Sequence, residues 1–544
     1  VRRADVRAVA ARWTRASRGR DAGLAAVAVA MTAIWMLHAV NSDDSIANAV
    51  GDVQFHIGFT LDETFAVLNG RTPLVDFTAQ YGSLWPYAIA LAMLAFGKTL
   101  LVFTIAMCVL SGIALLAIFD VLRRTTRSTL VALVLYLPFL ATSLFQVRGT
   151  IETRDTFATY FGIFPLRYAG PYLLAWLTAR QLERGGGRTG TWPLFVAAGL
   201  VLLNNTDFGL PACGATVAAL VWARVVPDRA AGLRLAGSVA AGLLTAFALV
   251  SALTLARTGS LPQPGRLTEY ARVYAVGGFG MLPIQGVLGL HIAIFLTYVA
   301  AIATATVRAV QHAPERVLTG MLAWSGIFGL GAGSYFIGRS HPEALIASFS
   351  AWALALVLLT VVVVRALAAS PARRPSVAAL LVLTGFGVAT CSLAQTPAPW
   401  LQFERLDEPF IPRGAPYFEQ PMLPSQDASV RRFISSLADG PDRFVVKRGA
   451  PVAILLTTGH RVADAYGVVN VSPYTGTLSI QTVEHVKVVI AALREAGGNT
   501  VVLPTAIDRG IYKLLAAEGF KVVTTDGLGP LHFMREPKPV VRPW

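Results

Sequence analysis

The sequence has little charge and little cysteine. Only 14% of its 544 residues are charged, whereas soluble domains average about 25%. All three cysteines (Cys108, Cys213 and Cys391) fall inside apolar runs, and no CxxC pair is present. The composition therefore argues against a disulfide-stapled domain, against CxxC redox chemistry and against a zinc cluster.

Several enzyme motifs are also missing. There is no HExxH for a zinc site, no GxGxxG after a strand and no GxxxxGK[ST], so nucleotide binding is disfavoured. The net charge of +15 would suggest nucleic acid in a soluble protein. Here the arginines lie mainly in short loops between apolar runs, where they set membrane topology, and we expect no nucleic-acid partner.

Long uncharged runs dominate what remains. Many are about 18 to 22 residues long, the length that crosses a bilayer core of about 30 Å. The sequence predicts an α-helical polytopic membrane protein with about eleven spans. The predicted spans are Leu24–Val40, Leu100–Phe119, Leu130–Phe145, Ala158–Ala179, Trp192–Leu203, Gly209–Trp222, Ala236–Leu255, Ile284–Val307, Leu318–Gly333, Ala344–Val364 and Val377–Leu393.

The arginine pattern predicts the orientation. The basic N-terminal segment before Leu24 indicates an uncleaved signal-anchor whose N-terminus is cytoplasmic, and every inner loop then carries arginine. The stretch Leu84–Phe96 is apolar but too short to span, so we expect an interfacial helix. The high Ala, Val, Arg and Gly content is typical of a GC-rich bacterial genome, and the expected location is the bacterial inner (plasma) membrane.

The composition changes after Gln395. We predict a cytoplasmic basic segment (1–23), a transmembrane domain (24–394) with an outer loop (41–98), a Pro-rich linker (395–430) and an extracytoplasmic α/β domain (431–544). The last domain alternates strand and helix patterns. These are strands at Val452–Gly459, Thr500–Pro504 and Phe520–Gly527, and helices at His485–Gly498 and Arg509–Gly519.

The outer loop Asn41–Lys98 is acidic in a basic chain. Asp43 and Asp44 follow the first apolar run, where a carboxylate at the rim of a helical bundle can act as general base on a hydroxyl. Adjacent side chains point in different directions, so one of the two would be the base. The other would orient it or hold a divalent cation, and a solvated boundary pair is the plain alternative.

A second group of residues could bind an anion at the outer face. Arg339 in GRSHPE offers a bidentate cation for phosphate, with Ser340 and His341 as further donors, although an interfacial arginine that snorkels would look the same. Other arginines could do the same work: Arg148, Arg154, Arg167 and Arg266.

Further polar residues could shape a pocket. Asn204, Asn205 and Asp207 lie between two short apolar runs and would be costly against lipid, so they are expected to line a cavity. Tyr81 fits the interfacial aromatic belt but could also stack on a sugar. His56 is more typical of a packed or interfacial histidine than of a ligand. The residues assigned to a sugar or acceptor pocket are His56, Asp76, Tyr81, Asn204 and Asp207.

The layout resembles the GT-C class of integral-membrane glycosyltransferases, which includes aminoarabinose, arabinofuranosyl, mannosyl and protein O-mannosyl transferases. An acidic residue follows the first span, as Asp43 and Asp44 do here. NGRTPLVDF and SLWPYAIALAMLAFGK then stand where the class has its interfacial loop, although QYGSLWP replaces the Pro-Pro-Leu segment of its best-known branch. The resemblance implies a polyprenyl-phosphate-linked sugar as donor and a cell-envelope glycan, lipid or protein as acceptor.

On that resemblance Asp43 or Asp44 would be the base, and Arg339 the phosphate clamp, with Asp76, Tyr81 and Asp207 at the sugar pocket. No resident metal or other cofactor is firmly implied. The rival hypotheses are a lipid-linked glycan transporter or flippase, a glycan polymerase or ligase of another family, and a non-catalytic envelope assembly protein. A transporter would favour ionisable residues at the midplane and an inverted repeat, and neither pattern is evident.

Overall fold

The structure is a computed structural model that describes residues 18–37, 52–144, 161–184, 190–226, 231–272, 290–338, 344–345, 347–369, 449–456, 458–475, 483–504, 509–524 and 531–535. The chain divides into two compact units. The first, the helical unit, comprises Val1–Val40, Met107–Leu249 and Val273–Phe410. The second, the mixed unit, comprises Asn41–Ala106, Val250–Arg272 and Ile411–Trp544. Two of the boundaries between them, after Ala106 and after Leu249, fall inside long helices.

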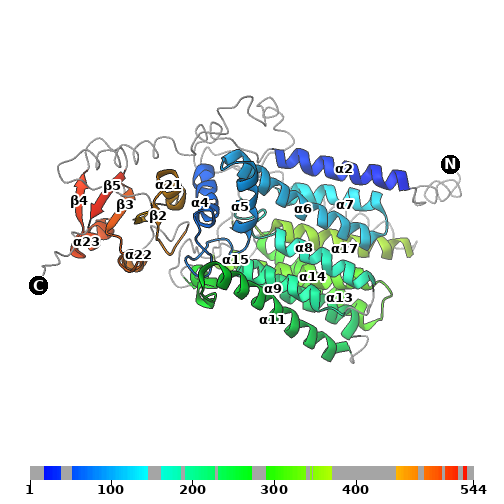
Figure 1. The fold of residues 1–544 in the computed structure, drawn as a ribbon. Coiled ribbons are helices and arrows are strands. Elements are labelled where there is room, and N and C mark those ends of the chain that lie inside the picture. The colour runs from blue at the N-terminus through cyan, green and yellow to red at the C-terminus, as the bar shows by residue number, and fades with distance from the viewer. Residues whose placement is uncertain are drawn as a thin grey trace, which may run out of the picture. The chain divides into compact units, whose positions relative to one another are not determined.

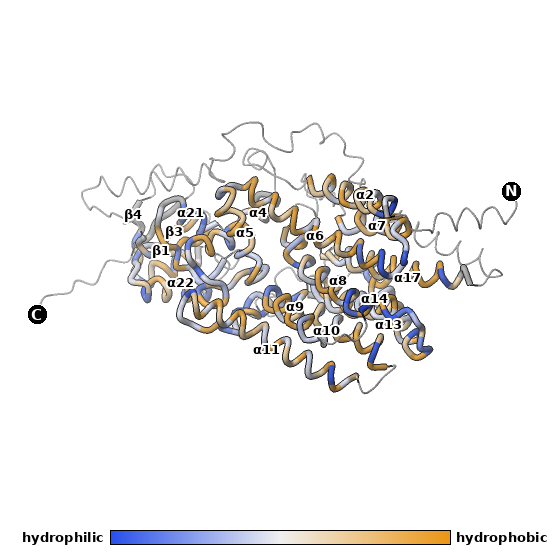
Figure 2. Tube along the Cα trace, turned by 45° about the vertical axis from the view of Figure 1, so that its right-hand side comes forward, coloured by the Kyte–Doolittle hydropathy of each residue, from blue (hydrophilic) through white to orange (hydrophobic). Residues whose placement is uncertain are grey.

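Helices make up the described part of the helical unit (Figure 1). They are α2 (Arg18–Leu37), α6 (Leu100–Thr126), α7 (Thr129–Ser143), α8 (Ala169–Arg184), α9 (Trp192–Asn204), α10 (Thr206–Leu220), the π-helix η1 (Val221–Val225), α11 (Ala231–Thr258), α13 (Leu290–Val310), α14 (Arg316–Ala332), α15 (Ser334–Gly338) and α17 (Phe349–Ala369). The first residues of α6 and the last of α11 belong to the mixed unit. Hydrophobic residues run along most of α6 and α11 (Figure 2).

Seven of the described helices are long and apolar enough to cross a membrane, and the chain is a multi-pass membrane protein. They are α2, α6, α10 with η1, α11, α13, α14 with α15, and α17. Of the eleven predicted spans, three more correspond to the shorter helices α7, α8 and α9, and Val377–Leu393 lies outside the described residues. In the described part of the predicted span Ala158–Ala179, residues 161–168 form turns and the helix begins at Ala169, with Pro171 in its first turn, where proline is tolerated.

Small residues and hydroxyl groups hold these helices together. A Cβ on Gly329 of α14 would lie 2.2 Å from the ring of Tyr298 in α13, so only glycine permits this approach. Thr32 of α2 and Tyr136 of α7 share a hydrogen bond of 2.7 Å, and Ser143 joins Ser350 of α17 at 2.7 Å. Such contacts matter in lipid because apolar surface alone does not favour one helix neighbour over another.

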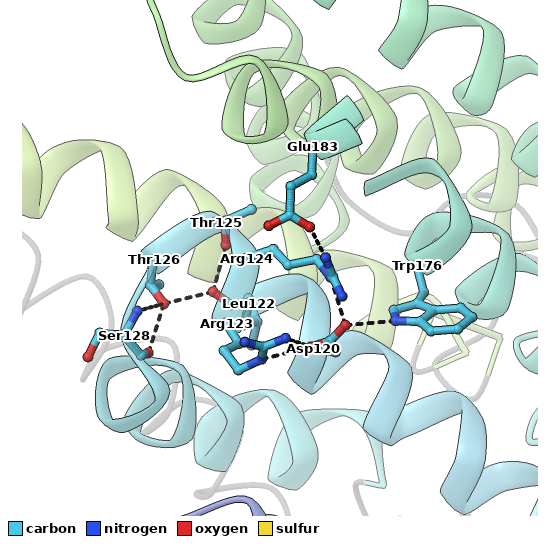
Figure 3. A network of polar contacts seen from close by, with 9 residues as sticks. All are labelled: Asp120, Leu122, Arg123, Arg124, Thr125, Thr126, Ser128, Trp176 and Glu183. Carbon is cyan, nitrogen blue, oxygen red and sulfur yellow. Dashed lines mark hydrogen bonds and ion pairs between the residues drawn. The ribbon is translucent and has the colours of Figure 1, made fainter. Parts of the chain in front are cut away.

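A polar network ties the end of α6 to the end of α8 (Figure 3). The Asp120 carboxylate accepts hydrogen bonds from Arg124 at 2.7 Å and from the Trp176 indole at 2.8 Å, and it pairs with Arg123 at 2.6 Å. Arg124 also pairs with Glu183 of α8. Each described charge in this network therefore has a partner of opposite sign.

The mixed unit combines helices with one small sheet. Its elements are α4 (Asp52–Leu68), α5 (Trp85–Phe96), the 3-10 turn η2 (Pro264–Leu267), β1 (Pro451–Ile454), α21 (Gly459–Tyr466), β2 (Val469–Asn470), α22 (Val483–Glu495), β3 (Thr500–Pro504), α23 (Arg509–Ala517), β4 (Lys521–Thr524) and β5 (Leu531–Arg535). The sheet order is β2-β1-β3-β5-β4. β1 runs parallel to β2 and β3, and β5 runs antiparallel to β3 and β4.

The α/β character predicted for the C-terminal region is confirmed by this sheet. The predicted helices and strands correspond to β1, α22, β3, α23 and β4, while α21, β2 and β5 were not predicted. Of the missed elements, β2 has only two residues, too few to show a period, and α21 has eight.

Helix α5 is apolar on two faces. Ile89 and Met93 are buried in the mixed unit, whereas Leu91, Leu94 and Phe96 are 66% or more exposed. Its 12 residues make a helix of about 18 Å, too short to cross about 30 Å of hydrocarbon. The short helix is as the sequence predicted, and its place at the membrane interface stays a prediction.

Candidate functional site

The predicted general bases and the predicted phosphate ligands all lie outside the described residues. They are Asp43, Asp44, Arg148, Arg154, Arg339 and His341. His56 lies in α4, and its side chain is not described. Their assigned roles therefore stay predictions.

Two predicted pocket residues lie at the turn between α9 and α10 in the helical unit. Asn204 ends α9, and Asp207 is an exposed side chain in the first turn of α10. Their neighbour Asn205 caps α10, because its side-chain oxygen accepts the Phe208 N–H at 2.9 Å. A structural role is thus established for Asn205, while a sugar-binding role for the other two stays a prediction.

The other predicted pocket residues lie in the mixed unit, on the segment between α4 and α5. The carboxylate of Asp76 accepts the Thr72 N–H at 2.7 Å, and the Asp76 N–H returns to the Thr72 carbonyl at 2.8 Å. Asp76 therefore closes a tight turn. Tyr81 is buried, with only 3% of the residue exposed.

An acidic pair that the sequence analysis did not assign lies next to this segment. Asp62 and Glu63, on α4, are 1% and 0% exposed. The Asp62 carboxylate accepts the Arg461 N–H at 2.9 Å, in the first turn of α21, and so caps that helix from a distant part of the chain. Glu63 Oε1 accepts the N–H groups of Gln80 at 2.5 Å and Tyr81 at 3.2 Å, and the Thr475 hydroxyl at 3.4 Å.

Burial governs the ionisation of this pair. It raises the pKa of Asp62 to about 8, against the opposing effect of the Arg461 and His460 N–H groups and the Arg461 charge. It likewise raises the pKa of Glu63 to about 8; the N–H groups of Gln80 and Tyr81 oppose the rise and the neighbouring Asp62 adds to it. No described group donates to Glu63 Oε2. The pair therefore binds protons more tightly than ordinary carboxylates.

Three arginines converge on the segment after α4. Arg71 donates to the carbonyl oxygens of Asp76 at 2.9 Å and of Val471 and Ser472 at 3.4 Å. Arg266 donates to the next carbonyl, that of Pro473, at 3.3 Å, so two guanidinium groups lie on consecutive carbonyls of one strand-like segment.

Arg257 completes the group. It donates to the Thr72 hydroxyl at 3.2 Å, and its guanidinium lies 5.3 Å from the centre of the Tyr87 ring. Because Arg257 lies in the last turn of α11, a helix apolar and long enough to span, the group lies where a candidate span ends.

The acceptors around these arginines are mostly neutral. Among the described residues no carboxylate forms an ion pair with Arg71, Arg257 or Arg266. Burial lowers the pKa of Arg71; Asp76 opposes this and the nearby charge of Arg266 adds to it. Burial also lowers the pKa of Arg266, and the charges of Glu269 and Asp76 oppose this. The two arginines thus donate to neutral carbonyls and have carboxylates close by without a direct ion pair, which leaves guanidinium N–H groups that an anion could accept from.

A carboxylate flanks the arginine group. Glu269 accepts the Thr78 hydroxyl at 2.6 Å, and Arg266 reaches the same hydroxyl at 3.4 Å. Burial and then Glu269 raise the pKa of Tyr474, which faces the ring of His485 at 5.0 Å. Residues of the C-terminal region therefore build part of the same polar cluster.

Backbone pairing holds this cluster together. Thr78 pairs with Tyr474 as an isolated parallel bridge, with Thr78 N–H to Pro473 carbonyl at 2.9 Å. Tyr270 donates its hydroxyl to the Thr475 carbonyl. These contacts help to position the segments that carry the arginine and carboxylate groups, as a binding site requires.

Sequence reasoning missed most of this cluster. Arg266 was one of the predicted alternatives for phosphate, but Arg71, Arg257, Glu269 and Asp62–Glu63 were not assigned. The one sequence signal was weak: the acidic pair inside TLDETF lies in a largely apolar segment, and a carboxylate that is buried there needs hydrogen-bond partners. In the part of the chain that is described, no three His, Cys, Asp or Glu side chains come together to hold a metal ion.

No protein-family model and no curated protein matches the sequence. Solved structures that are similar to it include two oligosaccharyltransferase structures and one of ArnT. The crystal structure of ArnT from Cupriavidus metallidurans bound to undecaprenyl phosphate matches 97% of this chain and 100% of its own, with 14% identity and a TM-score of 0.43. The archaeal oligosaccharyltransferase AglB from Archaeoglobus fulgidus, in complex with an inhibitory peptide and a dolichol-phosphate, matches 91% of this chain and 71% of its own, with 14% identity and a TM-score of 0.40.

The third is the Archaeoglobus fulgidus oligosaccharyltransferase in complex with Zn and sulfate, which matches 90% of this chain and 69% of its own, with 14% identity and a TM-score of 0.37. The resemblance seen in the sequence is thus accompanied by a structural similarity over nearly the whole chain. At this identity and these TM-scores the likeness concerns the course of the chain alone, and no residue role is carried over from these proteins.

Proposed function

We propose that this protein is a membrane glycosyltransferase of the bacterial plasma membrane. It transfers a sugar from a polyprenyl-phosphate donor to an extracytoplasmic acceptor, which is a cell-envelope glycan, lipid or protein. Asp43 or Asp44 is the general base, and an arginine group binds the donor phosphate. The N-terminus is cytoplasmic, and the C-terminal α/β region is extracytoplasmic.

The observation that carries the proposal is the arginine group of the mixed unit. Arg71 and Arg266 lie on consecutive carbonyls without a described ion-pair partner, and Arg257 joins them from the end of a candidate span. A lipid-tailed donor can leave its chain in the bilayer only if its phosphate binds at such a membrane boundary. The guanidinium group also matches phosphate oxygens in a bidentate manner.

The chemistry needs two complementary parts. The acceptor oxygen attacks the anomeric carbon, while the bond from that carbon to the phosphate oxygen breaks and its electron pair leaves with the phosphate. The proton of the acceptor hydroxyl passes to the carboxylate of Asp43 or Asp44. Cations held before the reaction begins, as Arg71 and Arg266 are, stabilise the charge that develops on the leaving phosphate.

Donor binding is the first test. Polyprenyl phosphate is titrated against the purified protein, and its Kd is measured for the wild type, for Arg71→Ala/Arg266→Ala and for Arg272→Ala. Arg272 is an exposed arginine of the same loop and serves as the matched control. We expect at least about tenfold weaker binding for the double variant and unchanged binding for the control.

Because Arg71 also supports the backbone of the segment 471–473, its loss could loosen the fold. The conservative pair Arg71→Lys/Arg266→Lys keeps the charge but loses the planar fork, and thermal unfolding checks that each variant is folded. Wild-type affinity in a folded alanine double variant would refute the arginine group as the phosphate site.

Transfer is the second test. Asp43→Asn, Asp44→Asn and the double variant are assayed for movement of radiolabel from a polyprenyl-phosphate sugar into a cell-envelope fraction. We expect a loss of transfer with retained donor binding in at least one single variant. Unchanged transfer in all three would remove the proposed base. Movement of the intact lipid-linked sugar across vesicles, without transfer, would favour the flippase instead.

A further inference from the structure

The segment 471–475 of the mixed unit begins where β2 ends, and its first three carbonyls accept hydrogen bonds from Arg71 and Arg266. Its first residue still pairs with the sheet, because the Val471 N–H donates to the Val452 carbonyl at 2.9 Å. The described strands include none of the residues that follow. Contacts outside the sheet therefore fix where these carbonyls lie.

The segment that follows α4 provides such contacts. The Thr78 N–H donates to the Pro473 carbonyl at 2.9 Å, and the Thr475 N–H donates to the Thr78 carbonyl at 3.3 Å. The Thr475 hydroxyl lies 3.1 Å from the same carbonyl. Thr78 is thus hydrogen-bonded to the segment on both sides of residue 474, and its own position decides where the segment lies.

Glu63 of α4 binds both sides of this pairing. Its Oε1 accepts the Gln80 N–H at 2.5 Å and the Tyr81 N–H at 3.2 Å. The hydroxyl of Thr475, which is 412 residues away in the sequence, lies 3.4 Å from the same oxygen. Because Glu63 is buried, water does not compete for these hydrogen bonds. One carboxyl oxygen therefore connects α4 to both partners of the pairing.

Guanidinium groups bind an anion well when their orientation is fixed before the anion arrives. We propose that Glu63 is a positioning residue for the donor phosphate: through residues 80–81 and Thr475 it fixes the carbonyls that orient Arg71 and Arg266. This role rests on the proposed function, in which the two arginines bind the phosphate of a polyprenyl-phosphate donor. Glu63 does not contact the donor itself, because its side chain is buried and its Oε1 is taken up by backbone N–H groups.

Donor affinity tests this role. The Kd of polyprenyl phosphate is measured for the purified full-length wild type, for Glu63→Ala and for Glu63→Gln. We expect at least about tenfold weaker binding in Glu63→Ala, because the two arginines lose their fixed orientation.

Glu63→Gln keeps an acceptor oxygen for the same N–H groups. Burial raises the pKa of Glu63 to about 8, so the amide also resembles the protonated acid that is present at neutral pH. This variant should bind within about threefold of the wild type. Equal weakening in the alanine and glutamine variants, or wild-type affinity in a folded alanine variant, would overturn the proposal.

A milder pair of variants keeps the test informative if Glu63→Ala does not fold. Thr475→Val removes the hydroxyl that lies near both Glu63 Oε1 and the Thr78 carbonyl. Thr64→Val makes the same change at the buried residue next to Glu63, whose hydroxyl has no described partner. We expect about threefold weaker donor binding in Thr475→Val and unchanged binding in Thr64→Val. Equal affinities in the two valine variants would overturn the proposal.

A double-mutant cycle separates this role from the donor site itself. Glu63→Ala is combined with Arg71→Ala/Arg266→Ala, and the Kd of polyprenyl phosphate is measured again. The triple variant should bind no more weakly than the double arginine variant, because the groups that Glu63 positions are gone. Additive losses would overturn the role of Glu63 and leave the arginine site standing. Wild-type affinity in the double arginine variant would refute the site and this role together.

Discussion

The two units handle buried and half-buried charge in different ways. In the helical unit the described carboxylates Asp120, Glu183 and Glu315 pair with arginines. In the mixed unit the buried Asp62 and Glu63 bind backbone N–H groups, and the arginines beside them bind carbonyl oxygens. The contrast concerns these groups and is not absolute, since Lys98 and Asp464 of the mixed unit form an ion pair and Arg365 of the helical unit also donates to a carbonyl.

The difference indicates what each arrangement is for. Ion pairs at helix ends neutralise both partners, so they latch helices together but leave little charge for a ligand. Peptide groups orient a charged side chain without cancelling its charge. The arginine group of the mixed unit therefore keeps its capacity to bind an anion, which is why the proposed donor site lies there.

The largest loss of stability is expected when Glu63 of the mixed unit is replaced. In Glu63→Ala three donors, the N–H groups of Gln80 and Tyr81 and the Thr475 hydroxyl, lose their buried acceptor. We expect a loss of about 3 kcal/mol or more in local stability, because each orphaned buried donor costs about 1–3 kcal/mol. Hydrogen exchange of the peptides that cover residues 78–81 and 471–475 measures it.

The control for that experiment is Glu63→Gln, which keeps an acceptor oxygen for the same donors. It should retain most of the protection. Equal exchange in the alanine variant and the wild type would show that the peptide donors find other acceptors, and that Glu63 does not hold the segment.

A smaller effect is expected at the cap of α21. Asp62→Ala removes the acceptor of the Arg461 N–H and should destabilise α21 by about 1–2 kcal/mol, the usual value of an N-cap. Asp62→Asn keeps an acceptor and should cost less. Exchange rates within Gly459–Tyr466 report the loss, and rates in β3 should stay as in the wild type.

The acidic pair also predicts a pH dependence. The pKa of both groups is raised to about 8 in the folded protein, above the ordinary values of 3.8 and 4.5, so the folded state binds more protons between these limits. Stability from this source is fully present below about pH 4 and is lost as pH rises through about 8. We expect the unfolding midpoint to fall between about pH 5 and pH 8 and to level off above that.

Thermal unfolding followed by tryptophan fluorescence measures that fall. The double variant Asp62→Asn/Glu63→Gln cannot ionise at these positions and should flatten the curve. A wild-type midpoint that rises with pH over the same range, while the double variant is flat, would reverse the assigned sign.

The smallest change is expected from the ion pairs of the helical unit. Arg124→Gln breaks the contacts with Asp120 and Glu183, and Glu183 is about half exposed. Exposed pairs contribute about 0.2–1 kcal/mol, so the loss should be in that range and should shrink further in high salt. If Arg124→Gln lost as much stability as Glu63→Ala, the ion pairs of the helical unit would matter as much as the buried carboxylate of the mixed unit, and the distinction drawn here would be wrong.

Much of the fold could be predicted from patterns within single segments. Uncharged runs identified the helices, the length of Leu84–Phe96 marked a short helix instead of a span, and β3 coincides with Thr500–Pro504. The site was harder because its parts are far apart in the chain. Arg71 and Arg266 meet only on the segment 471–473, and nothing in the sequence near either arginine indicates that segment.

The acidic pair shows the same limit. Asp62 and Glu63 lie on the largely apolar helix α4, and two adjacent carboxylates on a helix ordinarily face solvent. Their burial follows from partners hundreds of residues away, Arg461 and Thr475. The predicted bases Asp43 and Asp44 lie outside the described residues and stay predictions.

The sequence by itself determined that this chain is a multi-pass helical protein with a small α/β region. Hydrophobic length and period are local properties, and the cost of burying peptide groups in lipid leaves helices as the solution for such runs. Only the tertiary structure decided which charged groups meet. It places Arg71 and Arg266 on the consecutive carbonyls of residues 471–473, and it buries Asp62 and Glu63 in the mixed unit. Contacts between distant segments set those energies, and no window of sequence contains both partners.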